Sequence, residues 1–180
     1  MDLSFLVGLV GSIILVTGAA WPDAKKPGHP ARSLKNWLFT AGSACMFVYA
    51  VLGFLSGGSI FFVFLQILIA LATTVMMLNV SDRHGSPVIA LGGAGLIIWS
   101  LFLFQDYTTL VLIAGLITLA LGYVFQTATL RRGIALTLGS MLVALFSFIE
   151  ANWIFFWLNV FFAIFSAYYV LIRSVPVYEK

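Results

Sequence analysis

The sequence predicts an all-α integral membrane protein with seven transmembrane helices. Of its 180 residues, 62% are hydrophobic and only 8% are charged, and the mean hydropathy is +1.12. Soluble domains carry roughly a quarter charged residues. Apolar runs of membrane-spanning length recur along the chain between short polar segments. In hydrocarbon such runs satisfy their backbone hydrogen bonds as helices, and the apolar/polar alternation of a barrel strand is absent from this sequence.

The helix boundaries follow from the polar breaks. The first helix is expected to be retained, because Met1 and Asp2 do not supply the basic start of a signal peptide. Pro87 is expected to open the fourth helix, since a first helical turn tolerates proline, so that no proline lies inside a span. The predicted helices cover about residues 3–20, 37–55, 60–80, 87–104, 107–126, 133–149 and 152–173.

The charged residues predict the orientation. An odd number of crossings places the termini on opposite sides, and all nine basic residues then fall on one side, whereas Asp2, Asp106 and Glu150 fall on the other. The basic side is expected to be cytoplasmic. The N-terminus is therefore expected outside and the C-terminus in the cytoplasm, in a bacterial inner membrane. The basic residues are Lys25, Lys26, Arg32, Lys35, Arg83, Arg131, Arg132, Arg173 and Lys180.

An internal similarity relates the third predicted helix to the seventh. When Gln66 is set against Asn159, apolar and polar positions match without a gap. The matched pairs are Phe62/Phe155, Leu65/Leu158, Ala70/Ala163, Thr73/Ser166 and Leu78/Leu171.

The similarity extends to the other helices of each half. The second and sixth share a Thr-x-Gly-Ser pattern, which begins at Thr40 and at Thr137, and Tyr49 then falls on Phe146. The first and fifth share Gly11/Gly115, Ile13/Ile117, Leu15/Leu119 and Gly18/Gly122. The sequence thus predicts a parallel 3+1+3 repeat: a first bundle over 1–80, a linker helix over 81–106 and a second bundle over 107–180.

Polar residues at matched depth are the candidate solute ligands. An amide in hydrocarbon is costly without partners, so Gln66 and Asn159 are expected to face the interior. Thr73 shares the helix face of Gln66, and Ser166 shares that of Asn159. These faces could line a cavity and hydrogen-bond a neutral solute. Alternatively, the amides only tie helices together.

Aromatic residues complete the candidate site. Trp157 could stack on a ring-shaped solute, or it could face lipid. Tyr49 could complete a cavity wall, or it could serve packing. Trp21 and Trp37 near one boundary, and Tyr107 and Trp153 near the other, are expected to be interfacial.

Other chemistry is not expected. A single cysteine, Cys45, excludes an intrachain disulfide, and His29 and His84 show no metal-ligand spacing. No charged residue lies in the middle of a predicted span, which argues against ion coupling. No hydrolytic motif is present, so an enzyme, a metal site and a cofactor are not predicted. The pI near 9.2 comes from membrane-flanking segments and does not indicate nucleic-acid binding.

With seven crossings, a parallel repeat and matched polar residues in the third helix of each half, the chain resembles the SWEET-like superfold. That group includes SWEET sugar transporters, PnuC vitamin transporters and PQ-loop proteins. In size and topology the chain is similar to small bacterial inner-membrane proteins of the YgjV type. The resemblance implies a transporter whose polar residues Gln66 and Asn159 face a central cavity. The chain has no Pro-Gln pair.

Two functions remain open from the sequence. The first is a facilitator for a small uncharged polar or ring-bearing solute, working by alternating access between the repeats. The second is a non-transporting membrane protein, such as an assembly factor, a receptor or a subunit of a complex. The sequence leaves association into a homo-oligomer open.

Overall fold

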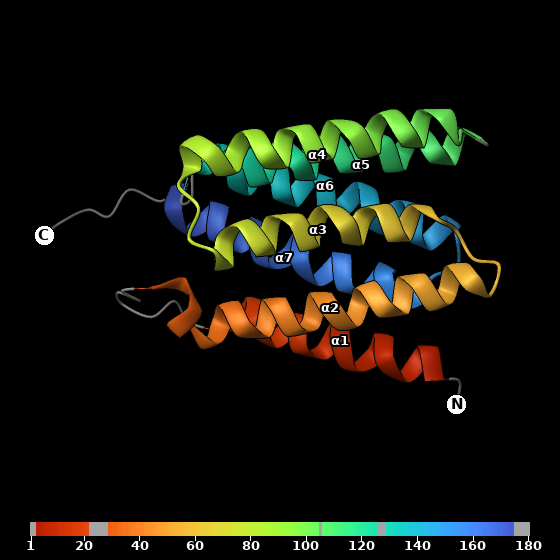
Figure 1. Cartoon of the computed structure of the whole chain (residues 1–180), viewed down its shortest axis with the longest axis horizontal. Helices are drawn as coiled ribbons and strands as arrows, with labels where there is room; N and C mark the ends of the chain where they lie inside the picture. Colours follow the sequence, from red (N-terminus) through yellow and green to blue (C-terminus); the bar gives the residue numbers. More distant parts are fainter. Residues whose placement is uncertain (1–2, 22–28, 105, 126–128, 175–180) are drawn as a thin grey trace, which may run out of the picture.

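The chain folds into a bundle of seven α-helices and one short 3-10 helix, as shown by a computed structural model that describes residues 3–21, 29–104, 106–125 and 129–174 (Figure 1). Consecutive helices run antiparallel, and from α2 onward they are joined by connections of only a few residues. The elements are α1 (Leu3–Ala20), η1 (Pro30–Arg32), α2 (Leu34–Leu55), α3 (Phe61–Met77), α4 (Asp82–Phe102), α5 (Tyr107–Val124), α6 (Leu130–Ile149) and α7 (Trp153–Ser174).

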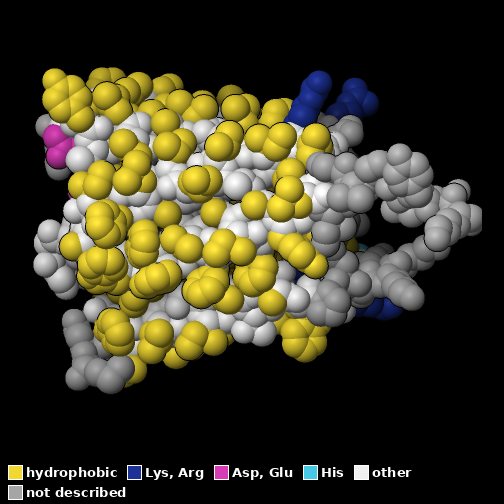
Figure 2. All heavy atoms as spheres, turned by 180° about the vertical axis from the view of Figure 1, so that it is seen from behind, with side chains coloured by type: hydrophobic (Ala, Val, Ile, Leu, Met, Phe, Trp, Pro, Cys, Tyr) yellow, Lys and Arg dark blue, Asp and Glu magenta, His cyan; other side chains and the backbone are white. Residues whose placement is uncertain are grey.

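The protein is an all-helical membrane protein. Six of its helices are long and apolar enough to cross a bilayer, and α3, with 17 residues, is shorter. At 1.5 Å per residue α3 is about 26 Å long, at the lower limit for a hydrocarbon core of about 30 Å. On the face shown in Figure 2, hydrophobic side chains cover the surface along the length of the bundle. The interfacial candidates Trp21, Trp37, Tyr107 and Trp153 are all exposed on it.

Six helices form a closed ring. Around it α1 packs on α2, α2 on α3, α3 on α5, α5 on α6, α6 on α7 and α7 on α1. The remaining helix, α4, lies outside the ring against α3 and α5 (Figure 1). If α1, α2 and α3 are exchanged with α5, α6 and α7, respectively, each helix of the ring keeps equivalent neighbours within the ring.

Glycines bring the paired helices into close contact in both halves. A Cβ added at Gly42 of α2 would lie 3.0 Å from the backbone nitrogen of Leu15, and one added at Gly139 of α6 would lie 2.9 Å from that of Leu119. Such distances leave no room for a side chain, so the helix backbones approach as closely as glycine allows.

The same correspondence holds at two further levels of each helix pair. A Cβ at Gly11 would lie 3.2 Å from Met46 N, and one at Gly115 would lie 3.4 Å from Val143 N. The third level pairs Gly18 with Phe39, at 3.5 Å, and Gly122 with Leu136, at 3.2 Å. Every one of these residues in one half occupies the position aligned with its counterpart in the other.

The predicted start of α4 is wrong. This helix begins at Asp82, so Pro87 lies inside it, not at its first turn. Proline removes one hydrogen bond to the residue four before it, here Arg83, which is exposed near the helix start and open to water. The added turn packs against α3, because a Cβ at Gly85 would lie 2.6 Å from Val75 Cγ1.

Three other helix ends differ from their predicted positions by three residues each. The helices α2 and α6 begin three residues earlier than predicted, at Leu34 and Leu130. The third helix ends at Met77 because Asn79 adopts a left-handed φ of 54°, and the N–H of Val80 donates to the carbonyl of Val75 at 3.2 Å. This left-handed termination ends the helix before the apolar run ends.

Charge is divided between the two ends of the bundle. Arg32 lies in η1, and Lys35, Arg83 and Arg131 lie at the starts of α2, α4 and α6, where Asp82 is the one acidic residue among the described helices. Asp106 precedes α5 and Glu150 follows α6 at the opposite end. Figure 2 shows basic side chains at one end and acidic side chains at the other. We refer to these as the basic end and the acidic end. Asp2, Lys25, Lys26 and Lys180 lie outside the described residues.

Matched glycine substitutions test this packing. We expect Gly42→Ala and Gly139→Ala each to lower the free energy of unfolding by about 1–3 kcal/mol, because the new methyl group meets backbone atoms of the neighbouring helix. Thermal unfolding of the protein in detergent, followed by tryptophan fluorescence, measures both. Gly95→Ala is the control, since a Cβ there meets nothing within 4 Å, and it should not destabilise. Equal melting temperatures for all three variants would contradict the packing described.

Candidate functional site

Gln66 is fully buried and unpaired. Its side chain has 0% exposure, and neither Nε2 nor Oε1 has a hydrogen-bond partner among the described residues. An unsatisfied buried amide costs about 1–3 kcal/mol, so such groups are rare in native structures. Gln66 therefore presents a free donor and a free acceptor inside the bundle.

Asn159 occupies the aligned position in α7 and is also buried, with 6% exposure. Its Nδ2 donates to the carbonyl oxygen of Phe155, one turn earlier in the same helix, at 2.8 Å. The two amides are thus not hydrogen-bonded to each other. In this conformation neither amide makes a hydrogen bond to another described helix, as the alternative role of tying helices together would require.

The hydroxyl candidates lie deeper toward the basic end. Thr73 is half-buried, and its hydroxyl donates within α3 to the carbonyls of Ile69 at 2.9 Å and Ala70 at 3.0 Å. Ser166 is half-buried in α7. Each follows its amide by two turns on the same side of its helix, as the spacing requires.

Trp157 lies on the outer surface of the bundle. Its side chain is 55% exposed, whereas its neighbour Leu158 is 3% exposed. The indole makes an edge contact with Phe156, at a centroid distance of 5.0 Å. The structure therefore places Trp157 away from the two amides and on the surface that faces lipid.

Four aromatic rings fill the interior between the amides and the acidic end. We call Tyr49, Phe62, Phe146 and Phe155 the aromatic cluster. Phe62 and Phe155 stack with centroids 4.6 Å apart, and each contacts one further ring: Phe62 contacts Phe146 at 5.3 Å, and Phe155 contacts Tyr49 at 5.5 Å. Since Phe62 aligns with Phe155 and Tyr49 with Phe146, the cluster has the same two-fold arrangement as the ring of helices.

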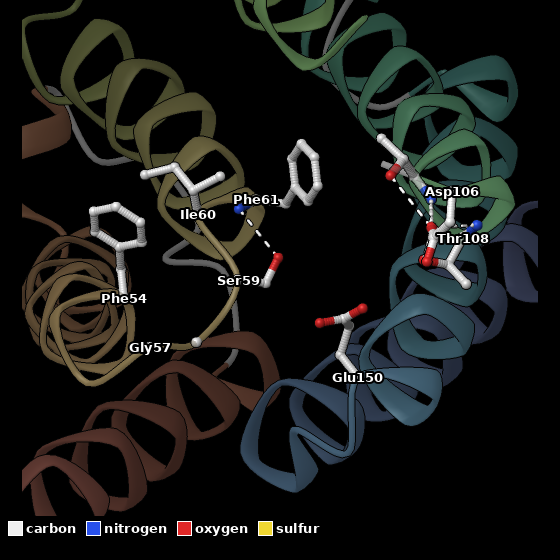
Figure 3. Close-up of a pocket in the computed structure, with 10 residues that line it drawn as sticks. Phe54, Gly57, Ser59, Ile60, Phe61, Asp106, Thr108 and Glu150 are labelled. Carbon is white, nitrogen blue, oxygen red and sulfur yellow. Dashed lines mark hydrogen bonds between the residues drawn. The ribbon is translucent and has the colours of Figure 1, made fainter. Parts of the chain in front are cut away.

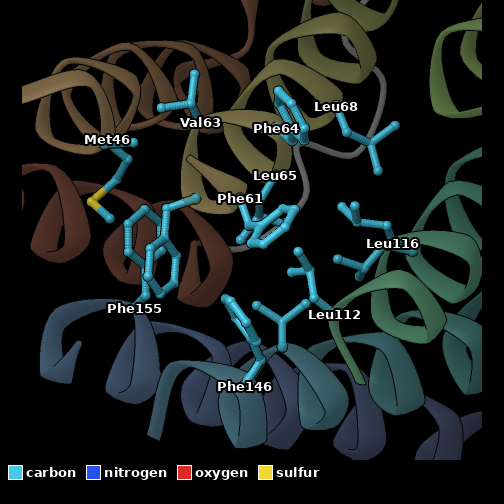
Figure 4. Packing of buried hydrophobic residues seen from close by; sticks show 14 of the residues in the cluster. Met46, Phe61, Val63, Phe64, Leu65, Leu68, Leu112, Leu116, Phe146 and Phe155 are labelled. Carbon is cyan, nitrogen blue, oxygen red and sulfur yellow. The ribbon is translucent and has the colours of Figure 1, made fainter. Parts of the chain in front are cut away.

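This aromatic cluster belongs to the hydrophobic core, where Phe61, Leu65 and Leu112 surround it (Figure 4). Gln66 follows Phe62 by one helical turn, and Asn159 follows Phe155 by one turn. The rings therefore separate the amides from the acidic end. The Tyr49 hydroxyl donates to Asn152 Oδ1 at 3.0 Å, which joins α2 to the start of α7.

Two adjoining cavities open at the acidic end, beyond the aromatic cluster. Their volumes are about 250 and 260 Å³, and they share Phe54, Ser59 and Glu150. Tyr49 and Phe62 line the second of them. Neither cavity is lined by Gln66 or Asn159. The expected hollow at the two amides is therefore not one of these cavities.

The sequence alone does not reveal these cavities. The stacked pair Phe62/Phe155 was visible as an aligned pair, but alignment alone does not show that two aligned residues touch across an axis. The sequence places Glu150 on the side opposite the basic residues, but its position beside the α2–α3 turn depends on the tertiary structure.

The carboxylates at the acidic end differ in environment. The hydroxyl and backbone N–H of Thr108, with the backbone N–H of Thr109, donate to Asp106 and lower its pKa. Partial burial raises the pKa of Glu150, and the negative charge of Asp106 raises it further. Asp106 is thus occupied as the N-cap of α5, whereas no described residue donates a hydrogen bond to the Glu150 carboxylate.

Comparison of the chain with models of known protein families, with characterised proteins and with solved structures finds no match. Among the described residues, no three His, Cys, Asp or Glu side chains are placed to hold a metal ion.

Replacing Gln66 tests whether its amide is unpaired. We expect Gln66→Leu to raise the free energy of unfolding by about 1–3 kcal/mol, because the desolvation cost of an unsatisfied amide disappears. Unfolding in detergent measures the change. Asn159→Leu is the matched control and should gain less, since its Nδ2 is already bonded. A clear loss of stability in Gln66→Leu would show that the amide has a partner.

Proposed function

We propose that the protein is a seven-crossing membrane facilitator for a small uncharged polar or ring-bearing solute. In this proposal the unit α1–α3 and the unit α5–α7 are two copies of one three-helix bundle, joined by α4. The solute binds between them near Gln66 and Asn159, and the copies rock against each other to open either side in turn.

The equivalence of the halves supports the duplication. The glycine contacts of α1 with α2 recur between α5 and α6 at aligned residues. The distances from the added Cβ to the backbone nitrogen are 3.2 and 3.4 Å at Gly11 and Gly115, 3.5 and 3.2 Å at Gly18 and Gly122, and 3.0 and 2.9 Å at Gly42 and Gly139. Aligned distances therefore differ by 0.3 Å or less. The ring order and the aromatic cluster follow the same exchange. An axis along the bundle that relates the halves is the geometry of a parallel repeat. The arrangement is similar in this respect to the SWEET-like superfold.

The unpaired amide of Gln66 carries the functional proposal. A buried group without partners is accounted for if a solute or water supplies them in another state of the cycle. An amide offers one acceptor and one donor group without net charge, which suits a neutral polar solute. Asn159 can release its intrahelical bond at little cost, because a solute donor or acceptor replaces it.

The aromatic cluster supports a state closed toward the acidic end. Rings from α2, α3, α6 and α7 meet on the path from the cavities to the amides. Opening this side requires Phe62 and Phe155 to separate, and rocking of the two halves separates them. The proposal therefore assigns the aromatic cluster as the barrier on this side.

The basic end is proposed to be cytoplasmic, which puts the N-terminus outside, in a bacterial inner membrane. Seven crossings require that α3 crosses as well, and α3 runs along the bundle between turns at both ends (Figure 1). A fluorescent protein fused to the C-terminus should fluoresce in bacterial cells. A fusion that is exported and does not fluoresce would show that the orientation is the reverse of the one proposed.

The filled interior favours a second candidate, a non-transporting membrane protein such as an assembly factor, a receptor or a subunit of a complex. The aromatic cluster occupies the space between the halves, and neither of the two cavities described reaches the amides. In such a protein Gln66 would hydrogen-bond a partner helix or a small ligand, and no solute would cross the membrane.

Uptake into proteoliposomes separates the two functions. We expect at least one member of a panel of neutral sugars, nucleosides and vitamins to enter faster than into empty vesicles. No flux for any member, together with no rise in melting temperature, would reject transport. A rise in melting temperature without flux would favour a receptor.

Variants locate the path of a transported solute. We expect Asn159→Ala and Gln66→Ala each to lower the flux about tenfold or more, the equivalent of about 1.4 kcal/mol for a lost hydrogen bond. Trp157→Ala is the control from the same helix and should transport normally, because its side chain is on the surface. Normal flux in both amide variants would remove them from the site.

A further inference from the structure

The cavities at the acidic end form a vestibule between the two halves, which we define by Phe54, Ser59, Phe61, Asp106, Thr108 and Glu150 (Figure 3). Its walls come from the α2–α3 turn on one side and from the start of α5 and the end of α6 on the other. A volume of about 250 Å³ holds about eight water molecules at roughly 30 Å³ each. The vestibule can therefore hold a solute with one small ring.

One carboxylate in the vestibule is uncommitted. The side chain of Glu150 extends between the α2–α3 turn and Asp106 (Figure 3) and makes no hydrogen bond with a described residue. Asp106 is occupied as the cap of α5. No Lys or Arg lines the cavities, and the described basic residues lie at the opposite end of the bundle. The net potential of the vestibule is thus negative, and an anion is repelled.

Aromatic rings accompany the carboxylate. Phe54 and Phe61 line the first cavity, and Tyr49 and Phe62 line the second, so the lining of each cavity includes aromatic rings. Ring faces attract cations, and their apolar surface favours carbon-bearing groups. A metal ion such as Ca²⁺ instead requires six to eight oxygen ligands, which one uncommitted carboxylate and a few hydroxyls do not supply.

We propose that this vestibule binds small organic ammonium ions, with the ammonium group at Glu150 and the carbon skeleton against the aromatic rings. Ser59, whose hydroxyl accepts a long 3.4 Å bond from the N–H of Phe61, is placed to accept a further ammonium hydrogen. The site is separate from the amides of Gln66 and Asn159, and it stands whether or not the chain transports a neutral solute.

The test uses the full chain in lipid nanodiscs, titrated with benzylamine at neutral pH and low salt, with binding followed by ligand-observed NMR. Benzyl alcohol and benzoate are the neutral and anionic analogues of the same size. We expect saturable binding of benzylamine, weaker binding of benzyl alcohol and none of benzoate. Glu150→Gln should weaken benzylamine about fivefold, as expected for one partly exposed charge pair, whereas Glu150→Asp should retain most of the affinity.

The controls separate this site from lipid partition and from the proposed solute site. Partition of benzylamine into the bilayer does not depend on Glu150, so the Glu150→Gln difference reports the vestibule. Phe54→Ala should also weaken binding, through loss of a ring, and Gln66→Leu should leave it unchanged. Equal affinity for benzyl alcohol, no effect of Glu150→Gln, or displacement of benzylamine by equimolar Ca²⁺ would overturn the proposal. None of these results bears on uptake of a neutral solute.

Discussion

Close approach of helix backbones at glycine is the constraint on which the rest of this structure depends. In hydrocarbon no hydrophobic force draws helices together, so small residues that let two backbones touch must supply the packing. Gly42 on Leu15, and Gly139 on Leu119, fix the distance and rotation of two helix pairs. With α1 and α2 held this way, and α5 and α6 held the same way, α3 and α7 occupy the two remaining places in the ring.

The ring then determines what its interior contains. With α3 and α7 on opposite sides of the ring, Phe62 stacks directly on Phe155, the residue aligned with it in the sequence. The same geometry brings Gln66 into the bundle one turn deeper, where packing with large apolar neighbours leaves its amide without a partner. At the acidic end, beyond the aromatic cluster, cavities lie between the helices, and Glu150 lines one of them opposite the α2–α3 turn. One packing rule thus produces a closed aromatic layer, an unpaired amide and a negatively charged vestibule.

The sequence was sufficient for the parts of the fold that depend on local composition. Apolar run length predicted seven helices, and α1 has its predicted ends at Leu3 and Ala20. The inward placement of Gln66 and Asn159 followed from the cost of burying an amide. The start of α4 could not be predicted, since a turn before Pro87 is stabilised by contact with Val75 of α3. The vestibule could not be predicted either, because its walls come from three turns far apart in the sequence. The surface position of Trp157 follows from the rotation of α7, which Phe155 and Leu158 set by packing inward.

Transport as proposed requires that the place occupied by Gln66 opens to water during the working cycle. A single thiol tests it directly: Gln66→Cys in a Cys45→Ser background, exposed to a membrane-impermeant thiol reagent in sealed vesicles of known orientation. We expect the introduced thiol to react without denaturant, although the Gln66 side chain is fully buried in the conformation described. A thiol that reacts only after the protein is unfolded in detergent would show a permanently closed core and would rule out this opening.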